Sequence, residues 1–417
     1  MAIMEHDTAV GAAPAAGRCP IDHRSFSQQK TAQVSEPAGR PLERDSAGVW
    51  HVRGHAQGQA ILRSPHTKQA GFKAELLERM PVQQENRPIL YLEGKPHHEQ
   101  RKQTARFFTP KAVSENYRQL MENYADHMIA QLRRAKQADL SELGMQLAVR
   151  VAGEVVGLTN SRLPGIARRL NSFFNDDLTD FGWSPLKLLR FARGQSRMLA
   201  FFYLDVKPAI EARRKQPRED VISHLLGKGY SDTEILTECV TYGAAGMVTT
   251  REFISITAWH LLEQPELREY YLGSGDEERL ELLQEMLRLE PVVGNLYRRA
   301  TADLELAVGD TTVTIPQGSL INLHTYAINA DESVVGEQPL AICPQREIKA
   351  ERAGPAMLGF GDGQHRCPGA YIALQETDIF LRRLLALPGL QIVQKPSVSW
   401  NPLITGYELR NFILAVR

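Results

Sequence analysis

The sequence predicts one large, mostly helical domain that carries a small β region. Three observations support this fold class. Between residues 108 and 272, apolar residues recur at helical spacing with few strand-like runs. After Pro291, short alternating segments separated by Gly and Pro turns replace that pattern. No internal repeat and no linker rich in Pro, Gly and Ser divides the 417 residues into modules.

The expected elements follow from these patterns. In chain order they are a strand at 49–52 with a helix to about 62, helices from 108 to 272 punctuated by Pro164, Pro185 and Pro208, a long helix at 235–262, strands at 304–308 and 311–315 around a Gly309-Asp310 turn, and a helix at 368–387 before a strand-rich tail.

The first forty residues predict a disordered leader, 1–40, ahead of the domain, 41–417. Glu5 and Asp7 stand where a secretory signal needs its apolar core, and small residues follow them. Cys19 and Pro20 are the residues that we expect to pin the leader locally. The leader is therefore excluded from the predicted fold.

Charge and cysteine content narrow the class of partner. The 49 basic and 49 acidic residues cancel to a net charge of +0, which favours neither nucleic acid nor an anionic membrane. Apolar stretches are broken by charges well before the roughly 20 residues that span a bilayer. The four cysteines are scattered singly, without CxxC pairs, as expected of free thiols in a reducing cytosol. We expect a cytoplasmic protein with a small, neutral ligand.

The most informative stretch is the loop 360–370, Phe-Gly-Asp-Gly-Gln-His-Arg-Cys-Pro-Gly-Ala. Its three glycines, which allow tight turns and close approach to a flat ligand, are Gly361, Gly363 and Gly369. A helix is expected directly afterwards, and its N-terminus, together with His365 and Arg366, favours a thiolate at Cys367. A thiolate suits a soft metal centre. The alternative is a glycine-rich loop with an inert cysteine.

This loop resembles the cysteine-ligand loop F-x-x-G-x-H-x-C-x-G of the cytochrome P450 family. The matching residues are Phe360, Gly363, His365, Cys367 and Gly369. The resemblance implies that Cys367 is the axial ligand of the iron of haem b, with Phe360, Gly361 and His365 beside the cofactor. Pro368 stands where many relatives carry leucine, a change expected to alter packing more than ligation.

A helical pair upstream has a second resemblance. Glu285 and Arg288 lie three apart and share a helix face, a spacing that usually marks an ordinary solvated pair. In its position the pair resembles the family's E-x-x-R motif, and Arg346 resembles the third member of that network. The implied role is structural support of the cysteine loop. Glu347 replaces the aromatic residue that usually follows the third member.

Two further segments resemble the parts of the family that hold the haem propionates. His97 and Arg101 lie four apart, so one helix face can present both to one anionic group. They match the family's H-x-x-x-R pair, and Arg298 resembles a further propionate-binding arginine. Each can instead be an ordinary surface charge.

The long helix carries a run of small residues at 243–246. The residues that share one face of it are Tyr242, Ala245, Gly246, Thr249 and Phe253. The run resembles the family's A-G-x-[D/E]-T-T oxygen-binding segment, which places Ala245 and Gly246 beside the haem and makes Thr249 catalytic. Val248 replaces the acid of that segment, so Glu252, one turn later, is a candidate proton relay or else an ordinary ion-pair partner. The other possible proton sources are the Thr249 hydroxyl with ordered water, and the substrate. The alternative is a tightly packed central helix.

The resemblance covers residues 48 to 415 and implies the triangular, predominantly helical P450 fold. It also implies activation of O₂ with electrons from NAD(P)H, delivered through a reductase and a ferredoxin. Lys102, Arg106 and Arg366 are candidates for a basic docking patch for that acidic ferredoxin, or are simply solvated charges.

The substrate class follows from the expected pocket. Its candidate segments are largely apolar: 69–92, 173–191, Ala245, Thr249, 292–296, Leu403 and Ile404. A small hydrophobic molecule is expected, such as a terpenoid, a fatty acid, an aromatic or another intermediate of secondary metabolism. Two alternatives stay open: altered haem-thiolate chemistry, which is peroxide-driven, couples or rearranges its substrate, and a haem sensor without enzymatic activity.

Overall fold

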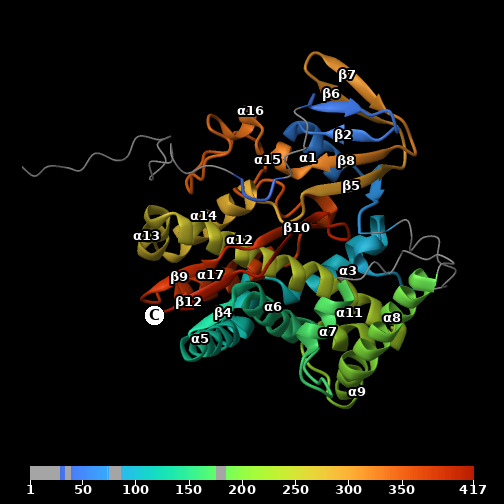
Figure 1. Cartoon of the computed structure of the whole chain (residues 1–417). Helices are drawn as coiled ribbons and strands as arrows, with labels where there is room; N and C mark the ends of the chain where they lie inside the picture. Colours follow the sequence, from blue (N-terminus) through green and yellow to red (C-terminus); the bar gives the residue numbers. More distant parts are fainter. Residues whose placement is uncertain (1–28, 33–38, 73, 75–85, 175–184) are drawn as a thin grey trace, which may run out of the picture.

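Helices make up most of the described chain, which comprises residues 29–32, 39–72, 74, 86–174 and 185–417 (Figure 1). The α-helices are α1 (His55–Arg63), α3 (Gly94–Thr104), α4 (Pro110–Ala112), α5 (Arg118–Ala135), α6 (Leu140–Val156), α7 (Ile166–Phe174), α8 (Pro185–Phe201), α9 (Lys207–Lys215), α10 (Val221–Gly227), α11 (Asp232–Tyr242), α12 (Thr249–Glu263), α13 (Pro265–Gly273), α14 (Asp276–Leu289), α15 (Thr325–Asn329), α16 (Glu332–Val335) and α17 (Ala370–Leu385). Three π-helical segments are η3 (Val113–Tyr117), η4 (Phe202–Val206) and η5 (Gly243–Val248), and three 3₁₀ turns are η1 (Ile89–Tyr91), η2 (Ala105–Phe107) and η6 (Gly363–His365).

Local sequence explains where several of these helices begin and end. Pro185 opens α8 and Pro208 lies in the first turn of α9, where a missing amide proton costs nothing. Ser231 and Glu234 form a reciprocal capping box at the start of α11. Gly157, with φ of 100°, ends α6 in the left-handed conformation that glycine favours. The predicted succession of helices is therefore confirmed.

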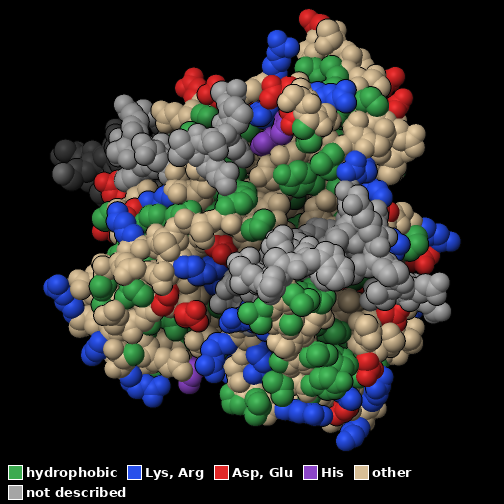
Figure 2. All heavy atoms as spheres, turned by 45° about the vertical axis from the view of Figure 1, so that its right-hand side comes forward, with side chains coloured by type: hydrophobic (Ala, Val, Ile, Leu, Met, Phe, Trp, Pro, Cys, Tyr) green, Lys and Arg blue, Asp and Glu red, His purple; other side chains and the backbone are tan. Residues whose placement is uncertain are grey.

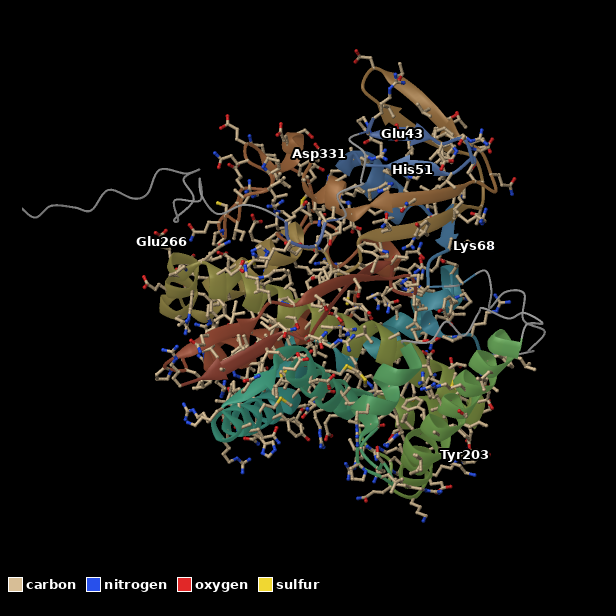
Figure 3. The ribbon with its side chains drawn as sticks, in the orientation of Figure 1. Glu43, His51, Lys68, Tyr203, Glu266 and Asp331 are labelled. Carbon is tan, nitrogen blue, oxygen red and sulfur yellow. The ribbon has the colours of Figure 1, made fainter. Side chains whose placement is uncertain are left out.

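The strands lie in two main regions, one at the top of the view in Figure 1 and one near the C-terminus. They are β1 (Leu42–Arg44), β2 (Trp50–Val52), β3 (Thr67–Gln69), β4 (Gln137–Asp139), β5 (Asn295–Ala300), β6 (Leu304–Val308), β7 (Thr311–Ile315), β8 (Leu320–His324), β9 (Leu390–Gln394), β10 (Ser397–Asn401), β11 (Gly406–Arg410) and β12 (Ile413–Val416). The largest sheet has the order β1-β2-β8-β5-β3, in which only the β2 and β8 pair is parallel. Glu43 and His51 are register partners in β1 and β2 and lie close together (Figure 3).

The predicted strands after Pro291 are confirmed. β6 and β7 form a hairpin in which Val308 pairs with Thr311, so that the turn consists of two residues. Gly309 has φ of 59° in that turn, a conformation that glycine adopts without steric cost. The C-terminal strands form two more antiparallel sheets, β10-β11 and β4-β12-β9.

The main hydrophobic core surrounds α12, which packs against α6 and α17 (Figure 1). Most side chains of α12 are buried on every side of the helix, as expected of a helix at the centre of a large domain. The predicted helix at 235–262 is thus α11, η5 and α12 in succession. A second, smaller core lies under the five-stranded sheet.

Residues 29–32, which fall within the predicted leader, contact the end of α14. The Gln29 side chain donates to the Leu289 carbonyl across 3.1 Å, and Thr31 is buried with its hydroxyl on the Glu290 carboxylate. A buried carboxylate that needs donors explains why this stretch is held. Residues 1–28, with Cys19, and 33–38 lie outside the described residues, and the domain boundary at residue 41 stays a prediction.

The predicted fold class, a mostly helical domain with a small β region, is confirmed. Basic and acidic side chains are interspersed over the face in Figure 2, as the balanced charge predicts. In the part of the chain that the structure describes, no helix is both long enough and apolar enough to cross a membrane.

Candidate active site

The predicted cysteine loop folds as a tight turn that packs on α1 and leads into α17. The Cys367 amide donates to the Phe360 carbonyl across 2.8 Å. Gly361 and Gly363 have φ of 67° and 65°. A Cβ atom at residue 363 would lie 2.1 Å from the Leu62 carbonyl oxygen. The loop therefore packs on α1 only because glycine occupies this position.

The Cys367 thiol is free and partly exposed. Burial raises the pKa of Cys367, while the Gly369 amide and two nearby arginines, Arg101 and Arg366, lower it. The start of α17 and these cations both favour a negative charge on sulfur. The side chains of Cys239 and Cys343 are buried instead.

Helix α3 brings its two predicted residues to the cysteine loop. His97 is buried, and its ring centroid lies 4.2 Å from that of His365. Arg101 donates to the backbone carbonyl that precedes Cys367. The charges of Cys367 and Tyr242 both act on the pKa of Arg101, which burial lowers. The Arg101 guanidinium is thus close to both the cysteine loop and the central helix.

Arg298 on β5 is buried, and the two hydrogen-bond acceptors of its guanidinium are neutral. Its guanidinium donates to the Gln69 side-chain oxygen and to the Tyr297 carbonyl. Burial lowers the pKa of Arg298 to about 10, and Glu93 offsets only part of this effect. Burial likewise lowers the pKa of His97 to about 4. Arg298 and Arg101 are cations that favour an anionic partner, and the neutral His97 ring can still donate a hydrogen bond. The three side chains therefore fit the two carboxylates of a haem.

The central helix exposes one narrow face. Ala245 is exposed, and Tyr242, Gly246 and Thr249 are partly exposed, although neighbouring positions such as Phe253 are buried. The Thr249 hydroxyl donates to the Ala245 carbonyl across 2.5 Å. This turn is π-helical, a geometry often found at functional sites. The structure therefore places Ala245, Gly246 and Thr249 together on an accessible surface.

The structure corrects the prediction that Glu252 is a proton relay. Its fully buried carboxylate accepts hydrogen bonds from the Leu409 amide, Arg410 and Arg251, each across 2.8 Å. Both oxygens are thus engaged in holding β11, and we withdraw the relay role. Val248 is also buried, with 1% of its surface exposed.

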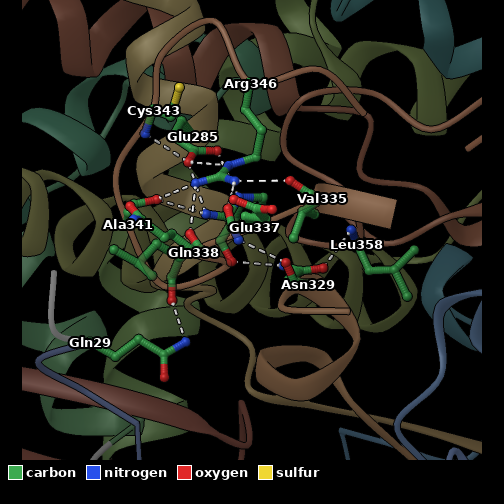
Figure 4. Close-up of polar contacts among 12 residues, drawn as sticks. Gln29, Glu285, Asn329, Val335, Glu337, Gln338, Ala341, Cys343, Arg346 and Leu358 are labelled. Carbon is green, nitrogen blue, oxygen red and sulfur yellow. Dashed lines mark hydrogen bonds and ion pairs between the residues drawn. The ribbon is translucent and has the colours of Figure 1, made fainter. Parts of the chain in front are cut away.

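The predicted structural network assembles around Glu285 (Figure 4). Its carboxylate accepts Arg288 at 2.7 and 2.8 Å, Arg346 at 3.0 Å and the Cys343 amide at 3.0 Å. Arg288 also donates to the Asn329 carbonyl across 2.8 Å. All three predicted members therefore meet at one buried carboxylate, which ties α14 to the segment before the cysteine loop.

Two segments predicted to line the pocket come together. The Gly294 amide donates to the Thr405 carbonyl across 3.0 Å, which joins the 292–296 turn to the loop with Leu403 and Ile404. Parts of the other two segments, residues 73, 75–85 and 175–184, lie outside the described residues.

Among the buried carboxyl groups that the sequence analysis did not single out, Glu376 and Glu238 have strongly raised pKa values. Burial raises the pKa of Glu376, on α17, to about 8, and the Thr250 hydroxyl opposes the shift. Burial raises the pKa of Glu238, on α11, to about 7. In each carboxyl group one oxygen has no hydrogen-bond partner within the described residues. A lone acid on an apolar helix face was the only local signal.

Comparison with known proteins supports the family resemblance. The sequence profile named Cytochrome P450 matches residues 281–394. Cytochrome P450-SOY of Streptomyces griseus is 26% identical, with 89% of this chain and 90% of that protein aligned. The erythromycin C-12 hydroxylase of Saccharopolyspora erythraea is 26% identical over 85% of this chain and 86% of its own.

Solved structures share the fold. A mutant of P450 EryK in complex with erythromycin B has a TM-score of 0.71 and 22% identity, covering 90% of this chain and 93% of its own. CalO2 has a TM-score of 0.73 and 21% identity, with coverage of 90% and 93%. The solved structures share the fold of this chain, and the sequence profile and the relatives aligned along most of its length show that it belongs to the cytochrome P450 family and is a monooxygenase of that family.

Proposed function

We propose that this enzyme binds haem b through Cys367 and inserts one oxygen atom of O₂ into a small, mainly hydrophobic molecule. The observation that carries the proposal is the meeting of the glycine-shaped cysteine loop, the arginines of α3 and β5, and the accessible face of the central helix. Arg101 connects these parts, because the charges of both Cys367 and Tyr242 act on it. The bound haem would supply the redox chemistry that activates O₂.

The proposal assigns a task to each of the site residues. The Cys367 thiolate would hold the iron, and the α17 N-terminus stabilises the charge on sulfur. His97, Arg101 and Arg298 would hold the propionates of the haem. The small side chains of Ala245 and Gly246 leave room beside it.

Proton supply is assigned to Thr249 and Glu376. The Thr249 hydroxyl is the polar group of the accessible face, and its bond to the Ala245 carbonyl fixes its orientation. Glu376 retains its proton near neutral pH because burial raises its pKa to about 8, although the Thr250 hydroxyl opposes this shift. A neutral buried carboxyl group is a suitable proton reservoir.

Electrons are proposed to come from NAD(P)H through a reductase and a ferredoxin. Lys102, Arg106 and Arg366 are all exposed and belong to α3, η2 and the cysteine loop. This patch suits an acidic protein that must approach the Cys367 side of the haem.

A natural-product intermediate is the proposed substrate class. Relatives carry the names erythromycin C-12 hydroxylase and pentalenic acid synthase, and Val292 and Ile404 give the candidate pocket apolar walls. Buried Val248 and engaged Glu252 favour one second candidate, peroxide-driven or otherwise altered haem-thiolate chemistry. Product formation with ferredoxin and NADPH, compared with hydrogen peroxide, separates the two.

Optical screening tests the proposed substrate class. A ligand that binds in the candidate pocket would change the absorbance spectrum of the haem-loaded enzyme, so a compound library can be read optically. We expect the hits to be predominantly apolar, because apolar walls favour apolar ligands. A library in which only highly charged compounds shift the spectrum would contradict this expectation.

A further inference from the structure

Glu238 joins three separate parts of the chain. The Oε1 atom of this α11 residue accepts the Ile89 amide across 3.0 Å and the Gln100 side-chain amide across 2.8 Å. Ile89 belongs to the described segment 86–91, which precedes α3, and Gln100 lies within α3. One carboxyl group thus holds both the segment and α3 against the central helix.

The surroundings of Glu238 are neutral. The side chain is 1% exposed, and its Oε2 atom has no hydrogen-bond partner within the described residues. Its two donors are uncharged amides. The ionisable groups that its charge affects are Tyr230, Cys239 and Tyr242, and burial raises the pKa of each of them, so they are neutral at pH 7.

Glu234, one turn earlier on α11, provides a contrast. Its Oε1 atom accepts the Asn86 amide across 2.8 Å, so it holds the same segment. Burial raises the pKa of Glu234, but hydrogen bonds from Ser231 and Asn86 outweigh that effect and lower it. The two carboxyl groups therefore differ at neutral pH: Glu234 is charged, whereas Glu238 binds its proton more tightly than an ordinary glutamic acid.

We infer that Glu238 is a positioning residue for the oxidation, which as a neutral carboxyl group holds segment 86–91 and α3 against the central helix and releases the segment on ionisation. The inference rests on the proposed function, because α3 carries His97 and Arg101 and the segment belongs to the proposed pocket. Protonation of one buried group then sets how tightly the pocket wall and the cofactor-holding helix are fixed.

The direction of the pH effect follows from the difference in proton binding by Glu238 between the closed and the open arrangement. Burial raises the pKa of Glu238 from 4.5 to about 7 in the closed arrangement, whereas water-exposed Glu238 in an open arrangement has its ordinary value. Between these values the closed form keeps a proton that the open form releases, so rising pH favours opening. Above about pH 7 both forms are ionised and the effect levels off. Between pH 5.5 and 7.5 the opening constant rises about twentyfold.

Hydrogen exchange of the peptide that contains residues 86–91 tests the inference on the haem-loaded enzyme. Wild type, Glu238→Gln and Glu234→Gln are compared at equal pH, so that the intrinsic pH dependence of exchange cancels. Relative to Glu238→Gln, wild-type opening should rise about twentyfold from pH 5.5 to 7.5. Glu234→Gln should exchange faster throughout but keep the wild-type pH slope. The pH profile of ligand affinity, read from the spin state, should flatten in Glu238→Gln alone.

An equal slope in wild type and Glu238→Gln would overturn the inference, as would a ligand-affinity profile unchanged by Glu238→Gln. If Glu238→Gln does not accumulate, the wild-type rates are divided by the intrinsic exchange rates of an unstructured peptide at each pH. A rise of about twentyfold then supports the inference, and its absence refutes it. The exchange measurement needs no turnover. Failure of the exchange slope with intact thiolate ligation rejects only this inference, whereas absence of thiolate ligation rejects the proposed function.

Discussion

Glu285→Ala is expected to accumulate as haem-poor or insoluble protein. Glu285 is 2% exposed and accepts hydrogen bonds from Arg288, Arg346 and the Cys343 amide. Its removal strands buried guanidinium groups, and breaking a buried pair in this way costs about 3–5 kcal/mol. The ratio of haem to protein and the midpoint of denaturant unfolding measure this effect.

Glu277→Ala is the matched control for that experiment. Glu277 lies on the same helix, α14, but is exposed. Surface replacements of this kind change stability by at most about 0.5 kcal/mol. A Glu285→Ala enzyme with full haem content and an unchanged unfolding midpoint would reject the structural role of the network.

Thr249→Ala is expected to consume NAD(P)H without forming the corresponding amount of product. The hydroxyl of Thr249 lies on the accessible face, whereas Val248 is aliphatic and Glu252 is fully engaged with β11. Loss of a positioned proton-transfer group typically costs roughly a hundredfold or more in the step it serves. Reducing equivalents should therefore appear as hydrogen peroxide, and product formed per NAD(P)H should fall.

Thr249→Ser restores the hydroxyl and should recover most of the coupling, which separates the chemical role from packing. Glu376→Gln removes the proposed proton reservoir and should also raise peroxide at the expense of product. If Thr249→Ala and Glu376→Gln both couple as well as wild type, the proposed proton supply is wrong and altered chemistry becomes the better account.

Local spacing explains which parts of the site the sequence predicted. The neighbours of Cys367 are adjacent in the chain, and the pairs on α3 and α14 share a helix face because of their three- and four-residue spacing. Such patterns fix which way side chains point. The structure accordingly brings together the cysteine loop, His97 with His365, and Glu285 with its arginines.

Contacts between residues far apart in the sequence explain what local spacing could not predict. Glu252 shares a helix with Thr249, but its carboxylate meets Leu409, which lies 157 residues away. Ile89 and Glu238 are 149 residues apart, and the leader residue Thr31 meets Glu290 across 259 residues. Helical periodicity describes one face of one element, whereas the group that this face meets depends on the packing of the whole chain.

Thiolate ligation by Cys367 is the central claim, and the absorbance spectrum of the ferrous carbon-monoxide complex tests it most directly. The wild type should show the red-shifted Soret band of a thiolate ligand, and Cys343→Ala, which alters a buried cysteine outside the loop, should keep it. Cys367→His should lose the band even where it still holds haem. A Cys367→Ala protein that retained the red-shifted band would contradict the account.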